Sequence, residues 1–483
     1  MQKPTLKVSG YRGIWGESLN TNIAKDYTYA FGQFIKNDSL HRSDLCKDKP
    51  TILIGRDGRE SGKEISEAII PILESLDIDV IDGDILPTPT IMFAVKKHNY
   101  DGAIIITASH NPIVYNGLKF VTGDARMINE EEVEKIKSFL ISDENSEQKY
   151  AIKAEQKINN SDRVGAPAER VKRQNSESFA EPLINFTREH ADSILEKINI
   201  DIIRAQKFKV AVDMINASAC VIDPYMFEKL GVEFIAINDT PNGKFAHTPE
   251  PLKENLSDLE KTVKENNCDI GFAQDPDADR LVIVNENGEC ISEEYTLSFC
   301  VENILSKNKN RNVVINMSTS QMTADIAEKY DGKTVRTKVG ESNVFAGMKN
   351  TNAIIGGEGG GGAIYPTMNN CRDSFVSIAL TLELLAERNQ TVTELVNSLP
   401  KYFMKKDKEN VEGKNLDEMY EKLKNHFKDV KINEEDGLRL DFPDKSWIHL
   451  RPSNTEPIIR LFGEAKTKEQ IDSLFNENKK ILE

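Results

Sequence analysis

The sequence contains little of what marks secreted, membrane-bound or disulfide-rich proteins. Only six cysteines occur in 483 residues, and no two of them form a C-x-x-C pair, so neither a disulfide framework nor a zinc cluster is predicted. No stretch approaches the roughly 18 consecutive apolar residues that cross a bilayer. The first residues, MQKPTLKVSGYRG, lack the apolar core of a signal peptide. We therefore expect a cytoplasmic protein with no membrane partner.

Basic residues are also in deficit. The chain has 62 lysines and arginines against 78 acidic residues, a formal net charge of -16. Extended nucleic-acid binding needs clustered basic surface that releases phosphate counterions. We therefore predict no nucleic-acid partner, although a few local arginines can still hold a small anion.

The order of apolar segments indicates repeated α/β units. A chain of this length predicts three or four domains at roughly 100 to 200 residues each. Apolar runs at 51–55, 78–83 and 102–106 alternate with an amphipathic stretch at 63–76, a pattern typical of βαβ units around a parallel or mixed sheet. The same rhythm returns at 208–214, 224–238 and 268–275, and again at 312–317 and 351–357. These patterns predict three similar α/β units in series.

The remaining segments differ in composition and hydrophobic pattern. Residues 142–178 are polar and poor in large apolar side chains, which predicts a linker or surface excursion. Amphipathic stretches at 416–427 and 467–482 flank the strand candidates 438–442 and 458–465, so a smaller α+β domain is expected to close the chain. The predicted domains are 1–160, 178–287, 288–402 and 403–483.

The first candidate functional loop is TASHNP at 107–112, which follows the apolar run GAIII at 102–106. Sheets in α/β units place ligands at the carboxyl ends of their strands. Ser109 is therefore a candidate nucleophile or phosphoryl carrier, provided that a base or a cation assists it. Lys119, in YNGLKF at 115–120, could neutralise phosphate or move protons in the same loop neighbourhood. Local hydrogen bonding in a turn is the alternative interpretation of the serine and histidine pair.

The second loop is DPDADR at 275–280. Carboxylates at alternate positions of a tight loop supply the hard oxygen ligands that Mg²⁺ and Ca²⁺ prefer. An EF-hand is excluded because Arg280 stands where that loop needs glycine, and LVIV at 281–284 continues as a strand. Arg280 beside the acids indicates an anionic ligand that meets the metal.

The third loop is GGEGGGGAIYP at 356–366, and the fourth is RPSNTEPIIR at 451–460. Glycines permit close backbone approach, but the third loop matches neither common nucleotide-binding motif. Its one functional side chain, Glu358, is suited to a sugar diol. The fourth loop combines two guanidinium groups with hydroxyl and amide donors, which suits a non-reacting phosphate. A flexible turn and a solvated turn are the respective alternatives.

In this order and spacing the four loops resemble the α-D-phosphohexomutase family, which includes phosphoglucomutases, phosphomannomutases and phosphoglucosamine mutases. The resemblance also covers SGYRG at 9–13, GRDGRESG at 55–62, LPTPT at 86–90, PNGKF at 241–245 and TKVGE at 337–341. It implies four domains in a heart-like arrangement around a central cleft, three of them similar α/β units and the last a smaller α+β domain.

The resemblance also implies the chemistry and the residues that perform it. Ser109 would carry the phosphoryl group, with Mg²⁺ held by that serine's phosphate and by Asp275, Asp277 and Asp279. A hexose 1,6-bisphosphate would form, turn over and return the other phosphate, and would also serve as activator. The catalytic positions would be Ser109, His110, Lys119, Arg12 and Arg280; the substrate-binding positions would be Glu358, Gly360, Gly340, Arg451, Ser453, Asn454, Thr455 and Arg460.

Departures from the family pattern leave the sugar open. Many relatives carry serine or asparagine at the position of Gly360, and some carry histidine at that of Gly362, so sugar recognition here must depend on Glu358 and the backbone. We expect mannose or glucosamine phosphates slightly ahead of glucose phosphate, bound by a monomer or homodimer. A magnesium-dependent sugar phosphatase is the main alternative, and a sugar-phosphate-binding relative without turnover is a further one.

Overall fold

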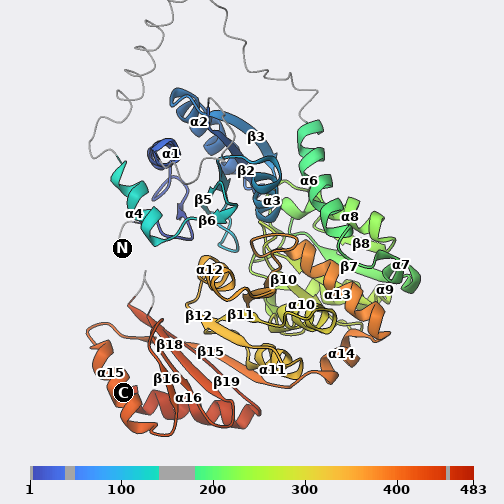
Figure 1. Cartoon of the computed structure of the whole chain (residues 1–483), viewed down its shortest axis with the longest axis vertical. Helices are drawn as coiled ribbons and strands as arrows, with labels where there is room; N and C mark the ends of the chain where they lie inside the picture. The colour runs from blue at the N-terminus through green and yellow to red at the C-terminus, as the bar shows by residue number, and fades with distance from the viewer. Residues whose placement is uncertain (1–3, 38–48, 141–179, 453–456, 483) are drawn as a thin grey trace, which may run out of the picture. The chain divides into compact units, whose positions relative to one another are not determined.

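The computed structural model describes residues 4–37, 49–140, 180–452 and 457–482. These residues form four β-sheets with accompanying helices (Figure 1). No helix among them is both long and apolar enough to cross a membrane. The predicted polar segment at 142–178 lies outside the described residues.

The first sheet has the strand order β1-β5-β4-β2-β3, with β6 paired to β5. Its buried strand β4, GAIII, shows no exposed residue, as expected for a strand covered on both faces. The elements of this part are β1 (Tyr11–Ile14), α1 (Thr21–Asn37), β2 (Thr51–Arg56), α2 (Glu60–Ser75), β3 (Asp79–Ile85), α3 (Thr88–His98), β4 (Gly102–Ile106), β5 (Tyr115–Thr122), β6 (Arg126–Met127) and α4 (Glu130–Ser138).

The second and third sheets have the orders β10-β9-β7-β8 and β12-β11-β13-β14. The second part contains α6 (Ala180–Leu195), α7 (Ile200–Gln206), β7 (Lys209–Asp213), η1 (Ser218–Val221), α8 (Asp223–Leu230), β8 (Glu233–Ile237), η2 (Lys253–Asn255), α9 (Ser257–Asn266), β9 (Ile270–Gln274) and β10 (Leu281–Val284). The third contains α10 (Glu294–Lys307), β11 (Val313–Asn316), α11 (Gln321–Lys329), β12 (Thr334–Thr337), α12 (Glu341–Thr351), β13 (Ile355–Glu358), β14 (Gly362–Ile364), α13 (Ser374–Arg388) and α14 (Val392–Ser398).

The three sheets share one topology, which confirms the predicted repeats. The repeated strands are β2 to β5 in the first sheet, β7 to β10 in the second and β11 to β14 in the third. In each set of four, the first strand pairs in parallel with the second and the third, and the fourth strand pairs antiparallel with the third. The first sheet adds β1 beyond its fourth strand, at β5. The three candidate loops TASHNP, DPDADR and GGEGGGG therefore occupy the same topological place, the connection from the third strand to the fourth.

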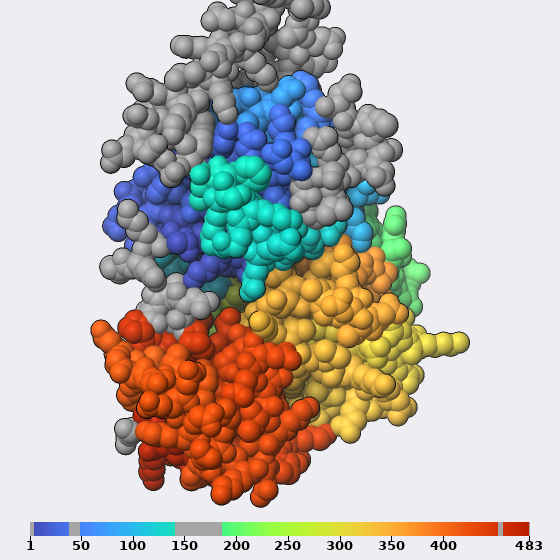
Figure 2. Space-filling model, turned by 60° about the vertical axis from the view of Figure 1, so that its left-hand side comes forward, coloured from blue at the N-terminus to red at the C-terminus, as the bar shows by residue number. Residues whose placement is uncertain are grey.

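The fourth sheet is antiparallel, with the order β15-β19-β18-β17-β16. Apolar residues of its central strands and of α15 and α16 form one core, and Figure 2 shows this domain as orange and red spheres. Its elements are β15 (Phe403–Asn410), α15 (Leu416–His426), β16 (Lys431–Asn433), β17 (Leu438–Asp441), β18 (Trp447–Pro452), β19 (Ile458–Ala465) and α16 (Lys468–Leu482).

The chain divides into two compact units. One comprises residues 3–290 together with 368–375, and thus holds the first two sheets; the other comprises 291–367 and 376–483 and holds the last two. The short segment 368–375 therefore belongs to the first unit although its neighbours in sequence belong to the second. It brings Arg372 and Ser374 against the loop between β9 and β10.

Two local features were not predicted from the sequence. Lys119 lies within β5, where it pairs with Ile105 of β4. The sequence of β15, FMKKDKEN, is too rich in charge to have predicted a strand. It is an edge strand of its sheet, and exposed charges at such an edge prevent pairing with other chains.

Candidate active site

Ser109 follows β4 and adopts a left-handed backbone conformation, with φ of 53°. Such a conformation costs a serine free energy and persists only when its surroundings enforce it. The Ser109 backbone N–H donates to Thr107 Oγ1 at 2.8 Å, and the Thr107 hydroxyl donates to Asp57 at 2.6 Å. Ser109 is 1% exposed, so its hydroxyl sits in a shielded site.

Arg59 is the main clamp on this loop, and the sequence motifs did not single it out. The fully buried guanidinium donates to the carbonyl oxygens of Ser109 at 2.6 Å, Asn111 at 2.8 Å and Pro112 at 3.0 Å. Its Nε donates to Asp57 at 2.9 Å, which balances the charge. A planar fork of five N–H donors is suited to hold several acceptors at once. Its only sequence signal was its place in GRDGRESG at 55–62.

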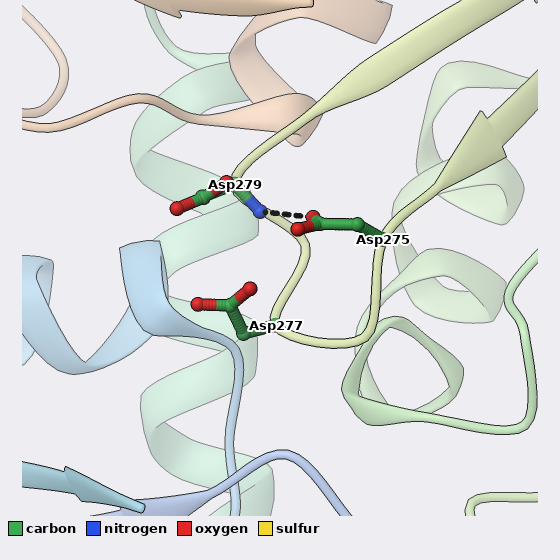
Figure 3. Close-up of side chains that lie close together, drawn as sticks. All are labelled: Asp275, Asp277 and Asp279. Atoms are coloured by element: carbon green, nitrogen blue, oxygen red, sulfur yellow. Dashed lines mark hydrogen bonds between the residues drawn. The ribbon is translucent and has the colours of Figure 1, made fainter. Parts of the chain in front are cut away.

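The loop between β9 and β10 carries Asp275, Asp277 and Asp279, and one oxygen from each lies within 4.8 Å of the others. All three side chains are buried, and Figure 3 shows them on one loop. The dashed line in Figure 3 is the Asp279 N–H donating to Asp275 Oδ1 at 3.1 Å, which turns the loop back on itself. Ala278 at its tip has a positive φ of 56°, and its carbonyl accepts the Ser374 hydroxyl at 2.7 Å.

Groups from the first sheet meet this aspartate loop directly. Lys119 Nζ contacts Asp277 Oδ2 at 2.5 Å and Asp279 Oδ2 at 3.5 Å. Thr88, in the LPTPT segment at the start of α3, donates its hydroxyl to Asp277 Oδ2 at 2.7 Å. The Ser109 hydroxyl donates to Asp275 Oδ2 at 3.1 Å. The serine and the aspartates predicted from separate motifs therefore form one cluster.

Arg372 completes the ring of cations and was missed by the sequence reasoning. Its Nη2 lies 2.7 Å from Asp279 Oδ2. No motif indicated Arg372. It lies on the segment 368–375, and local sequence pattern does not predict that this segment packs in the first unit. Arg12, on β1 opposite Gly117 of β5, and Arg280 are also near enough to interact with the aspartates.

Burial and charge set the protonation of the site. Burial raises the pKa of Asp275 well above its usual value, with Asp279 and Asp277 adding to the shift. Burial also acts to raise the pKa of Asp277, but the charge and hydrogen bond of Lys119 outweigh it, and the net pKa is lowered. Burial, then the charges of Arg280 and Arg12, lower the pKa of His110 to about 2. His110, whose Nδ1 lies 3.3 Å from Ser109 Oγ, is therefore neutral at pH 7.

Four buried polar atoms of this cluster have no hydrogen-bond partner in the described part of the chain. Two are acceptors, Asp277 Oδ1 and Asp279 Oδ1, and two are donors, Arg12 Nε and Arg280 Nε; Asp279 Oδ1 and Arg280 Nε lie 3.8 Å apart, beyond hydrogen-bond distance. Buried polar groups normally find partners, so each exception needs an explanation. Orphaned carboxylate oxygens suit a hard divalent cation, and orphaned guanidinium N–H groups suit a phosphate. The residues fit both a magnesium ion and a phosphorylated ligand.

The predicted sugar loop lies in the second unit, where Glu358 ends β13. Its Oε1 accepts the Gly340 N–H and the Asn316 amide, each at 2.8 Å. Gly340 is the N-cap of α12 with a φ of 125°, a conformation that favours glycine. Gly360 lies in the turn between β13 and β14. The structure thus brings Glu358 and Gly340 together and adds Asn316 as a support.

The predicted phosphate clamp connects β18 to β19 in the same unit. Arg451 and Arg460 are directly opposite each other across these strands, so both guanidinium groups project from one face of the sheet. Ser453, Asn454 and Thr455, also predicted to bind phosphate, lie outside the described residues.

Comparison with known proteins agrees with this organisation. Four family models match in order: phosphoglucomutase/phosphomannomutase alpha/beta/alpha domain I at residues 3–147, domain II at 188–288, domain III at 292–403 and the C-terminal domain at 405–481. The chain belongs to the phosphoglucomutase/phosphomannomutase family. The predicted α-D-phosphohexomutase resemblance and the four-domain α/β fold are thereby confirmed. Members of this family are phosphohexomutases, which are intramolecular phosphotransferases of the isomerase class.

Individual members of the phosphoglucomutase/phosphomannomutase family match along nearly their whole length. The chain is 32% identical over 481 residues to a phosphoglucomutase/phosphomannomutase of Thermococcus kodakarensis, covering 98% of this chain and 97% of that protein. It is 31% identical to a phosphoglucosamine/phosphogalactosamine mutase of Sulfurisphaera tokodaii, with 98% of both covered. A crystal structure of a family protein from Burkholderia thailandensis matches with a TM-score of 0.79 and 25% identity, covering 100% of this chain and 97% of that one.

Proposed function

We propose that this phosphohexomutase interconverts hexose 6-phosphate and hexose 1-phosphate through a phosphate carried on Ser109 and a hexose 1,6-bisphosphate intermediate. The observation that carries the proposal is the set of buried donors and acceptors without hydrogen-bond partners at the aspartate cluster. The first aspartate of this cluster, Asp275, accepts the Ser109 hydroxyl. A shielded serine next to paired anion and cation sites is suited to phosphoryl transfer, in which positioning and electrostatics supply most of the rate.

In the forward step, the free hydroxyl of a hexose monophosphate attacks the phosphorus of phosphorylated Ser109. The new P–O bond forms to the sugar oxygen, and the bond to Ser109 Oγ breaks with its electron pair staying on the serine oxygen. The proton that the sugar hydroxyl releases is taken up by that serine oxygen, which restores the free hydroxyl. Burial acts to lower the pKa of Lys119, but Asp277 and Asp279 raise it overall, so Lys119 is a cation at neutral pH. Arg12, Arg280 and Lys119 offset the negative charge of the transferring group.

The cofactor fits the same residues. Mg²⁺ would be held by Asp275, Asp277 and Asp279 and would supply positive charge beside the transferring phosphate. Arg59 keeps Ser109 in place during the transfer, and Thr88 keeps Asp277 in place. Hexose 1,6-bisphosphate would serve as activator by loading the serine with phosphate.

In the return step, the bisphosphate turns over, and Ser109 Oγ attacks the phosphorus at the other end of the sugar. The bond from that phosphorus to the sugar oxygen breaks, and the sugar oxygen takes up the proton that the Ser109 hydroxyl releases. We propose that Glu358 recognises sugar hydroxyls and that Arg451 and Arg460 hold the phosphate that is not reacting. Ser453, Asn454 and Thr455 would add hydroxyl, amide and backbone donors to this clamp.

We favour mannose and glucosamine phosphates slightly over glucose phosphate. The relatives named above carry glucose, mannose, glucosamine and galactosamine in their names, so similarity does not choose among these sugars. Gly360 and Gly362 offer no side chain, which leaves recognition to Glu358, the backbone and neighbouring groups. A loop of this kind accommodates more than one sugar, so we expect several hexose phosphates to be converted at different rates.

The test is ³¹P NMR of the purified protein with Mg²⁺ and a trace of glucose 1,6-bisphosphate. Glucose, mannose and glucosamine 6-phosphates are supplied in separate samples. A new sugar 1-phosphate signal that is absent from Ser109→Ala would support the proposal and rank the sugars. Inorganic phosphate alone would indicate a sugar phosphatase, and unchanged spectra in all samples would indicate a binding protein; either result would overturn the mutase proposal.

A further inference from the structure

A carboxylate outside the proposed mutase machinery lies between the phosphate clamp and the sugar loop. Asp436 precedes β17 in the fourth domain. Its Oδ1 accepts from Arg451 Nε at 3.0 Å, and its Oδ2 accepts from the backbone N–H of Val339 at 2.8 Å. The side chains of Asp436 and Arg451 are 15% and 26% exposed, so solvent screens this pair only in part. One carboxylate thus binds a side chain of the fourth domain and the backbone of the third.

The contact to Val339 leads directly to the sugar loop. Val339 precedes Gly340, whose N–H donates to Glu358 Oε1 at 2.8 Å. Because these two N–H groups belong to adjacent residues, a shift of the Asp436 carboxylate moves the peptide that supports Glu358. Arg451 and Glu358 are therefore joined through a single carboxylate and one dipeptide.

The backbone at Asp436 is itself held in place. Its carbonyl oxygen lies 2.6 Å from His449 Nε2, and His449 Nδ1 lies 2.9 Å from the Ser318 hydroxyl in the third domain. Nearby, Arg439 donates to the carbonyl oxygen of Met317. His449 and Arg439 are 0% and 1% exposed. These buried polar contacts dock the open face of the fourth sheet on the third domain and fix the register of Asp436.

Asp436 also offsets positive charge in the phosphate clamp. Arg451 and Arg460 are paired directly across β18 and β19, and like charges in that position repel each other. Asp436 offsets one of the two charges when no anion is bound. It engages Arg451 through Nε, so the Nη1 and Nη2 atoms keep the fork geometry that binds a phosphate.

We propose that Asp436 is a positioning residue that couples the phosphate clamp to the sugar loop, so that phosphate at Arg451 and sugar hydroxyls at Glu358 are recognised as one ligand. The preferred ligand class is a hexose carrying a phosphate, in preference to inorganic phosphate. This inference rests on the proposed roles of Arg451 and Glu358, and it adds the residue that makes them act together.

The test is a double-mutant cycle on ligand binding. Titration calorimetry measures glucose 6-phosphate and, separately, inorganic phosphate binding to the full chain, with Ser109→Ala in every variant to prevent turnover. The variants are Asp436→Asn, Glu358→Gln and the double substitution. Both partners of Asp436 are donors, and asparagine has only one acceptor oxygen, so Asp436→Asn cannot serve both. The matched control is Glu435→Gln, because Glu435 is exposed.

We expect Asp436→Asn to weaken glucose 6-phosphate binding about tenfold and inorganic phosphate binding about threefold, losses within the usual range for one partly buried charged contact. Glu358→Gln should cost clearly less affinity in the Asp436→Asn background than alone, while Glu435→Gln changes neither ligand. Restoring both acceptors with Asp436→Glu should recover part of the loss. Normal melting of Asp436→Asn would show that the loss is not due to unfolding.

Additive costs of the two substitutions, or equal weakening of both ligands, would overturn the coupling. So would an Asp436→Asn variant that binds like the control. The outcome is separable from that of the proposed function. Additive costs with intact Ser109-dependent mutase activity refute only the coupling, whereas non-additive costs in a chain that forms no sugar 1-phosphate refute only the mutase.

Discussion

Replacing Arg59 by lysine should impair phosphoryl transfer far more than it impairs folding. The substitution keeps the positive charge beside Asp57 but removes the planar fork. The guanidinium makes four hydrogen bonds, to Asp57 and to the carbonyl oxygens of Ser109, Asn111 and Pro112. An ammonium group is a compact donor that cannot reach acceptors so far apart.

The expected magnitude follows from these contacts. The lysine would keep its contact with the Asp57 carboxylate and lose at least two bonds to carbonyl oxygens. Hydrogen bonds with a charged partner contribute about 1.5–3 kcal/mol each, so the loop is released by roughly 3 kcal/mol or more. If that energy holds Ser109 in its left-handed conformation, kcat should fall about 100-fold, since each 1.4 kcal/mol is about tenfold in rate.

The assay compares kcat and KM for hexose phosphate conversion with the rate at which glucose 1,6-bisphosphate phosphorylates Ser109, followed by intact mass. Arg56→Lys is the matched control, because Arg56 pairs with Asp84, whose side chain is 46% exposed. We expect kcat and serine phosphorylation to fall together in Arg59→Lys, with KM little changed. An Arg59→Lys variant whose kcat is within twofold of the wild-type value would refute this role of Arg59, whatever the stability of the variant.

Three further predictions concern the metal, the buried carboxyl Glu294 and the sugar loop. Mg²⁺ should raise the melting temperature of the wild type, because binding at 100 times its Kd adds up to about 3 kcal/mol to the free energy of unfolding. Asp277→Asn should lose this response, and Asp201→Asn, at an exposed position, should retain it. Burial raises the pKa of Glu294 from 4.5 to about 8, so the stability that its neutral form contributes is full below pH 4.5 and lost as pH rises through 8. Glu294→Gln should therefore be more stable than the wild type by about 3 kcal/mol at pH 7, at about 1.4 kcal/mol per pH unit above 4.5, and denaturant titrations at pH 5 and pH 8 that show parallel curves would contradict this. A methyl group on Gly359 would lie 2.0 Å from Glu294 Oε1, so Gly359→Ala should raise KM for hexose phosphates several-fold while kcat at saturating substrate changes little; an unchanged KM would contradict it.

Much of the fold and the main site residues could be predicted from local pattern. The apolar strand GAIII and its successor loop placed Ser109 correctly at a strand end, because a strand buried on both faces reads as a continuous apolar run. The aspartates of DPDADR were recognisable because alternate carboxylates on a tight turn have few structural uses. The three repeats followed from spacing alone.

Other features depend on contacts that sequence distance hides. Arg59 donates to carbonyl groups about fifty positions later in the chain. Its local sequence does not distinguish it from a solvent-exposed loop arginine. Arg372 reaches Asp279 only because the segment 368–375 returns to the first unit. Asp436 contacts a backbone N–H of another domain, and a backbone partner leaves no trace in the side-chain pattern. Strand β15 was missed because edge strands carry charges that local propensity assigns to loops.

The most direct test of the account is to locate the phosphate during turnover. The protein is incubated with Mg²⁺ and glucose 1,6-bisphosphate, digested, and its phosphopeptides are sequenced by mass spectrometry before and after an excess of mannose 6-phosphate is added. The account predicts phosphate on Ser109 that is discharged to the sugar, and no mutase activity in Ser109→Ala. Phosphate on another residue, or an active Ser109→Ala enzyme, would contradict it.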